Sequence, residues 1–80
     1  MPNVWRHDGW RFYFYYNQGD PREPAHVHVR KANGEAKFWL EPNVSLAESS
    51  GIDARSLREL LDLVEARHAM LLRSWNDYFT

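Results

Sequence analysis

Hydrophobic and polar residues alternate through most of the first half of the chain, which is typical of antiparallel strands with one face in a core. The alternating segments predict strands over about 3–7, 10–16, 25–31, 35–41 and 44–47. Asp8-Gly9 lies between the first two segments and Asn33-Gly34 between the next two, and both dipeptides favour two-residue hairpin turns. We therefore expect two hairpins in one sheet, followed by a short fifth strand.

The second half of the chain changes to helical spacing. Apolar residues recur every three or four positions from Leu57 onward, and Asp53 precedes them as a helix N-cap. The pattern predicts one helix over about 54–79. At about 1.5 Å per residue this helix would be roughly 39 Å long, whereas a compact chain of 80 residues is only about 30 Å across.

The length of this helix predicts that its end leaves the domain. No Gly or Pro lies between Ile52 and Thr80 to bend it, so we expect the end to project. The projecting end carries Trp75, Tyr78 and Phe79, and such apolar surface needs a partner, either another protein or a second copy of the chain in a homodimer. The alternative is that this end folds back under the sheet.

Composition and length favour a single globular domain over residues 1–80. The predicted fold class is α+β in two layers, an antiparallel sheet of four or five strands covered on one face by the long helix. The absence of cysteine excludes a disulfide framework and thiol chemistry. No apolar segment is long enough for a signal peptide or a membrane span, so we expect a cytoplasmic protein without membrane contact.

The two hairpin turns fix which residues share a face of the sheet. With Asn33-Gly34 as the loop, the register places His28 opposite Trp39 and His26 opposite Glu41. The residues expected on the outer face are Arg6, Arg11, Tyr13, Tyr15, His26, His28, Arg30, Lys37, Trp39 and Glu41. The residues expected on the core face are Trp5, Trp10, Phe12, Phe14, Val27, Val29, Phe38 and Leu40.

Cations interleaved with aromatic residues on this outer face have three interpretations. They can stack bases and contact phosphates of single-stranded RNA, although the net charge of −1 means that such binding must come from local clustering. They can contact a protein partner, or the cationic side chains can simply extend into water. Two like-charge pairs, Arg6 with Arg11 and Arg30 with Lys37, favour an anion nearby.

His26 and His28 point to the same face and suggest chemistry. As metal ligands they form only half a site, because no third ligand is evident, and we expect no cofactor. As a general acid and base they fit a metal-independent ribonuclease, in which Glu41 orients His26 while Arg22 or Arg30 stabilises charge on a phosphate. The remaining interpretation is that both histidines only make contacts within the protein.

Four segments of the chain resemble one bacterial family. They are Pro24-Ala25-His26-Val27-His28-Val29, Lys37-Phe38-Trp39-Leu40-Glu41-Pro42, Arg11-Phe12-Tyr13-Phe14-Tyr15 and Trp75-Asn76-Asp77-Tyr78-Phe79. By these segments the chain is identified as a member of the domain-of-unknown-function family numbered four thousand one hundred and sixty, with Ala25 where the family has a proline. The resemblance implies no established activity. It does imply a gene pair with a second small protein, in the manner of a toxin–antitoxin module.

Two functional hypotheses follow. The first is a small cytoplasmic interaction module, one half of a toxin–antitoxin-like pair, that binds a protein partner through the sheet face around His26, His28 and Trp39, with RNA as a further candidate. The second is the metal-independent ribonuclease. The two hypotheses differ in whether the histidines contact a partner or catalyse a reaction.

Overall fold

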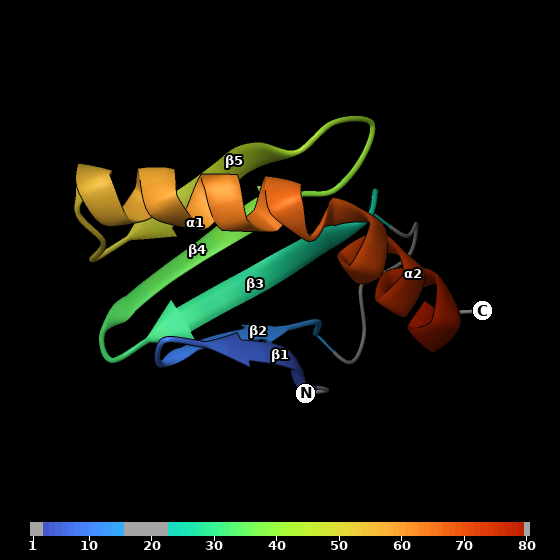
Figure 1. Ribbon diagram of the computed structural model, residues 1–80, viewed down its shortest axis with the longest axis horizontal. Helices are drawn as coiled ribbons and strands as arrows, with labels where there is room; N and C mark the ends of the chain where they lie inside the picture. Colours follow the sequence, from blue (N-terminus) through green and yellow to red (C-terminus); the bar gives the residue numbers. More distant parts are fainter. Residues whose placement is uncertain (1–2, 16–22, 80) are drawn as a thin grey trace.

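The computed structural model describes residues 3–15 and 23–79, which form an antiparallel sheet and two helices in an α+β arrangement (Figure 1). The strands are β1 (Asn3–His7), β2 (Trp10–Tyr13), β3 (His26–Lys31), β4 (Gly34–Trp39) and β5 (Ser45–Ser50), and the helices are α1 (Ala54–Ala66) and α2 (His68–Phe79). The five strands lie side by side in chain order. The radius of gyration is 11.8 Å.

The core lies between one face of the sheet and the helices. Figure 1 shows α1 across this face, while α2 lies beyond the ends of β2 and β3. The fully or almost fully buried residues of the cluster are Phe12, Phe14, Ala25, Val27, Val29, Ala36, Phe38, Leu40, Leu60, Val64, Leu71 and Trp75. Alternation in the strands and helical spacing in α1 and α2 therefore meet in one core, as the sequence pattern predicts.

The first hairpin has the predicted register. His7 pairs with Trp10 and Trp5 with Phe12, across a turn in which Asp8 (φ 49°) and Gly9 (φ 84°) both have positive φ. Positive φ at both central residues is the requirement of a type I′ turn, which Asp-Gly satisfies easily. Beyond Trp5 the register shifts at a bulge, and β2 ends at Tyr13 instead of continuing to residue 16, which lies outside the described residues.

The second hairpin has a pairing register that differs from the prediction by two residues, since Phe38 pairs with Val27 and not with Val29. Its loop is Ala32-Asn33, with Ala32 at φ 52°, and Gly34 is the first residue of β4. A Cβ at Gly34 would lie 2.8 Å from Cγ1 of Ile52, so the glycine serves a close approach to the turn before α1 instead of the hairpin loop. A two-residue shift leaves every side chain on its predicted face.

The predicted single helix is wrong, because it breaks at Arg67. The amide of Arg67 is shared between the carbonyls of Leu63 (3.1 Å) and Val64 (3.2 Å), and the chain then turns into α2. Nε2 of His68 donates to the carbonyl oxygen of Leu40 at 2.6 Å, which holds the start of α2 at the end of β4. The tertiary contacts bend the helix without Gly or Pro, and the apolar end does not project.

The end of α2 packs against the sheet, which is the alternative that the sequence left open. Trp75 is 4% exposed, and its ring lies 5.3 Å from that of Phe14 and 5.1 Å from that of His26. Phe79 is half-buried against Trp75, while Tyr78 remains 37% exposed. The N-cap of α1 is as predicted, since Oδ1 of Asp53 accepts from the amide of Ser56 at 2.7 Å.

Candidate binding site

The outer face of the sheet, the side turned away from α1, is organised in rows that run across the strands. One row joins Tyr13, His28, Lys37 and Glu48, each paired with the next on the neighbouring strand. A second row joins Arg6, Arg11, Arg30, Glu35 and Ser50 in the same way. The predicted pairing of Arg30 with Lys37 is therefore wrong. Arg30 lies opposite a carboxylate instead.

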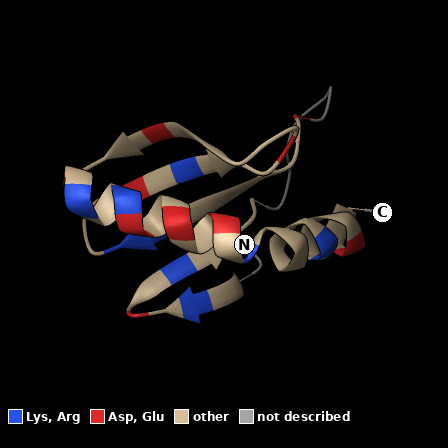
Figure 2. Ribbon diagram, turned by 45° about the horizontal axis from the view of Figure 1, so that its top comes forward, with Lys and Arg blue, Asp and Glu red and all other residues tan. Residues whose placement is uncertain are grey.

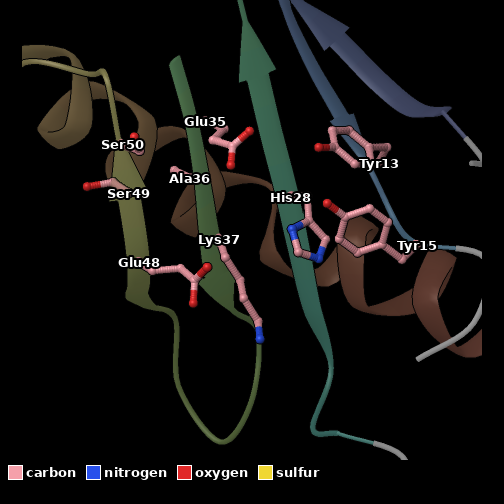
Figure 3. A pocket seen from close by; sticks show the side chains of 9 residues that line it. All are labelled: Tyr13, Tyr15, His28, Glu35, Ala36, Lys37, Glu48, Ser49 and Ser50. Carbon is pink, nitrogen blue, oxygen red and sulfur yellow. The ribbon is translucent and has the colours of Figure 1, made fainter. Parts of the chain in front are cut away.

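A hollow of about 150 Å³ opens on this face (Figure 3). Its lining residues come from four adjacent strand segments: Tyr13, Tyr15, His28, Glu35, Ala36, Lys37, Glu48, Ser49 and Ser50. Figure 3 shows His28 between the two tyrosines and the carboxylates of Glu35 and Glu48. The hollow thus combines aromatic rings, an imidazole and acidic groups in one small space.

His28 occupies the centre of this site in a neutral form. Burial, together with the smaller effects of His26 and Lys37, lowers the pKa of His28 to about 4. Its ring is stacked on that of Tyr13 at 5.5 Å and lies 4.1 Å from that of Tyr15. Nε2 of His28 is buried and has no hydrogen-bond partner among the described residues. Buried polar atoms are nearly always paired, so this nitrogen is an exception among the polar groups of the sheet.

His26 has a structural environment that differs from that of His28. It is 1% exposed, and its Nδ1 donates to the carbonyl oxygen of Pro24 at 2.8 Å. Burial lowers the pKa of His26 as well, so the ring is neutral near pH 7. Its ring contacts that of Trp75 at the end of the sheet. His26 therefore connects β3 to α2.

Lys37 is engaged with the chain itself. Its Nζ lies 2.8 Å from Oε1 of Glu23 and 4.4 Å above the ring of Trp39. The hydrogen bond from Lys37 lowers the pKa of the Glu23 carboxyl. Glu48, the cross-strand neighbour of Lys37, is left without an ion pair among the residues that the structure describes, and the same holds for Glu35.

The other predicted site residues are more dispersed. Glu41 is exposed beyond the end of β4, and the residue opposite His26 is Trp39 instead. Arg22 lies outside the described residues. Within residues 3–15 and 23–79 no group of three His, Asp or Glu is arranged to hold a metal ion, and neither helix is long and apolar enough to cross a membrane.

Sequence reasoning missed the acidic side of the hollow. Glu35 follows the presumed loop and Glu48 follows the presumed fifth strand, so neither was assigned to the outer face. The available signal was the alternation of Glu35, Lys37 and Trp39 along one strand, which places all three on one face. Glu48 carried no comparable signal, because β5 shifts register at a bulge.

The comparisons with known proteins identify a family. The family model described as "Domain of unknown function (DUF4160)" matches residues 9–76. No curated protein and no solved structure matches the chain. The matched range contains β2, β3, β4, β5 and α1, and with them every residue that lines the hollow.

Proposed function

Since the chain belongs to the DUF4160 family, whose description assigns no activity, we propose from its geometry that it is a small interaction module that binds a protein partner through the outer face. In this proposal the chain is one half of a toxin–antitoxin-like pair, and the partner is the small protein encoded beside it. The hollow around His28 is the anchor point of the interface.

The observation that carries the proposal is the hollow on the outer face, where the half-buried ring of His28 lies against that of Tyr15. Tyr15, beside His28, is 44% exposed. Tyrosine on an exposed hollow is the kind of residue that dominates protein interfaces.

The distribution of charge favours a protein over RNA. Figure 2 shows basic residues on β1, β2 and β3, whereas β4 and α1 carry both signs and β5 carries an acidic residue. On the outer face Arg6, Arg11 and Arg30 stand on one side, and Glu35 and Glu48 on the other. A phosphate backbone is bound by clustered Lys and Arg side chains, and the carboxylates on this face oppose such binding. A face with both signs is complementary to a folded protein or a peptide.

The ribonuclease hypothesis has less support. A general acid and base must both reach the substrate, and His26 is 1% exposed with its Nδ1 bonded to Pro24. Glu41, the proposed orienting group, is not the cross-strand neighbour of His26. The pKa of about 4 for His28 also leaves no protonated imidazole near pH 7 to act as the acid.

The proposal is tested by co-expression with the product of the adjacent gene, which carries an affinity tag. The wild-type chain is compared with Tyr15→Ala on the outer face and with Tyr78→Ala on α2, a matched exposed tyrosine. Thermal melts first establish that both variants fold. We expect the wild type and Tyr78→Ala to co-purify with the tagged protein and Tyr15→Ala to be lost.

Two outcomes contradict the proposal. If Tyr15→Ala still co-purifies with the tagged protein and Tyr78→Ala does not, the interface lies at the end of α2. Binding of single-stranded RNA by the wild type, abolished by Tyr15→Ala in the absence of any co-purifying protein, would make the outer face an RNA-binding surface instead.

A further inference from the structure

Three arginines lie side by side across the outer face, one on each of β1, β2 and β3. Arg6 pairs with Arg11 across the first hairpin, and Arg11 pairs with Arg30 on the next strand. Their neighbours Phe12 and Val29 are buried in the core, so the arginines point to the opposite face. Figure 2 shows basic residues on these three adjacent strands. We call Arg6, Arg11 and Arg30 the arginine row.

The chain does not neutralise the arginine row. All three residues are exposed, and none of them forms an ion pair within the part of the chain that the structure describes. Glu35 follows Arg30 across the sheet, yet no ion pair joins these two side chains. Like charges directly opposite each other on a sheet are destabilising, and Arg11 has such a neighbour on each side. The arrangement therefore favours an anion that lies across the row.

The surroundings of the row favour carboxylates of a protein over phosphates of RNA. Single-stranded RNA binds where ring faces are open for its bases to stack. The aromatic residue beside Arg11 on this face is Tyr13, which is 4% exposed. Its ring packs against those of Tyr15 and His28. At the β4 end, the charge of Glu35 opposes a phosphate backbone that continues past the row.

The length of the row suits a short acidic segment. Neighbouring strands lie about 4.8 Å apart, so the row spans roughly 10 Å from β1 to β3. Alternate residues of an extended peptide are about 7 Å apart, and Cβ atoms four residues apart on a helix are about 6 Å apart. Two acidic side chains at either spacing therefore match the row, and arginine binds carboxylates in a bidentate manner.

We propose that the arginine row binds an acidic segment of the protein partner, with Asp or Glu carboxylates lying across Arg6, Arg11 and Arg30. The inference rests on the proposed function, since it names the chemistry that the partner brings to the outer face. The row lies two residues along the strands from Tyr13 and His28, which line the hollow, so both features belong to one continuous surface. Exposed charges of this kind accelerate association and depend on salt.

The experiment titrates the isotopically labelled full chain with N-acetyl-tetraglutamate amide and follows the amide signals of Arg6, Arg11 and Arg30 by NMR. The matched probes are N-acetyl-tetraglutamine amide, which has the same length without the charge, and tetrauridylate, which carries phosphates. The matched variants are Arg11→Gln in the row and Arg58→Gln, an exposed arginine on α1 whose loss changes the net charge equally. Thermal melts establish that both variants fold.

At a salt concentration of about 20 mM, where screening is weak, we expect saturable shifts at the row with tetraglutamate. Tetraglutamine should cause none, and tetrauridylate should bind more weakly. Arg11→Gln should weaken tetraglutamate binding about three- to fivefold, as is typical for the loss of exposed ion pairs. Arg58→Gln should leave the affinity nearly unchanged.

Three outcomes would overturn the inference. They are the absence of shifts at the row with tetraglutamate, equal weakening by Arg11→Gln and Arg58→Gln, and tighter binding of tetrauridylate than of tetraglutamate. If the adjacent-gene product still co-purifies through Tyr15 in any of these cases, the proposed function stands without the acidic segment. If tetraglutamate binds as expected and no adjacent-gene product co-purifies, the proposed pairing fails and the row remains a site for acidic segments.

Discussion

At the scale of single residues, the burial of His28 on the outer face is the feature that alternation did not predict. The pattern placed His26 and His28 on one face, and the structure agrees. The pattern did not indicate that Tyr13 and Tyr15 pack against the ring of His28. It also did not indicate that Trp75 packs against the ring of His26. Burial depth depends on residues far away in the chain, and the spacing within one strand contains no information about them.

The low pKa of His28 predicts that stability falls as the pH is lowered. Its pKa is about 4 when folded and about 6.5 when unfolded, so between these values only the unfolded chain takes up the proton. Stability is complete above pH 6.5 and decreases progressively toward pH 4, and for this partly exposed ring we expect a loss of about 1–2 kcal/mol. Urea unfolding at pH 7 and 4.5 measures it.

The comparison that isolates this effect uses His28→Gln, which should lose less stability than the wild type over the same pH range. His7→Gln, on a strand edge with an exposed side chain, should retain the full wild-type loss. An identical pH dependence for the wild type and His28→Gln would show that another group is responsible.

Trp75 is the residue whose role changes most between sequence and structure. The sequence placed it on a projecting end, whereas it is 4% exposed against Phe14 and His26. Trp75→Ala should therefore destabilise the fold by about 3–5 kcal/mol. Tyr78→Ala, at an exposed position three residues later, should change the free energy of unfolding by about 1 kcal/mol or less. Denaturant unfolding of both variants decides between a core role and a surface role.

At the scale of elements, the two hairpins differ in how well a turn dipeptide predicted them. Asp8-Gly9 forms its turn without competition, because the nearest atoms to a Cβ at Gly9 belong to the flexible side chain of Lys31. Asn33-Gly34 does not, because Gly34 has to fit against Gly51 and Ile52. A local signal is reliable only where no tertiary contact needs the same glycine for another purpose.

The displaced loop leads to a prediction about Ala32, which has φ 52°. A residue with a Cβ is destabilised by roughly 1–2 kcal/mol in the left-handed region. Glycine avoids this steric cost, but it loses more backbone entropy on folding, which offsets part of the gain. Ala32→Gly should therefore stabilise the protein by about 0.5–1 kcal/mol in thermal or urea unfolding. Ala54→Gly, at the first residue of α1, is the control and should not stabilise. A destabilised Ala32→Gly would contradict the turn geometry.

The break between α1 and α2 is a second case in which tertiary contacts override a local sequence signal. Helical spacing continues through Arg67 without interruption, and the sequence therefore predicted one helix. The break is produced by the hydrogen bond of His68 to Leu40 and by the burial of Leu71 and Trp75. The longest dimension of the molecule, 34 Å, is shorter than the roughly 39 Å of an unbroken helix.

At the scale of the whole molecule, the sheet brings four strands together so that one row crosses the outer face from Tyr13 to Glu48. The α+β class with an antiparallel sheet, and the outer-face positions of β2, β3 and β4, followed from alternation, whereas the single long helix did not hold. The acidic side of the hollow did not, because it depends on the pairing of β4 with β5 through a bulge. The site is thus a property of the assembled sheet.

The most direct test of the account is the NMR footprint of the adjacent-gene product on the labelled full chain. If the outer face is the binding surface, the amide and side-chain signals that shift or broaden on binding belong to Tyr15, His28, Lys37 and Glu48. Signals from the exposed acids Glu59 and Asp62 on α1 should remain unchanged. A footprint centred on α1 or on the end of α2, or no footprint from a protein that co-purifies, would contradict the claim that the outer face is the binding surface.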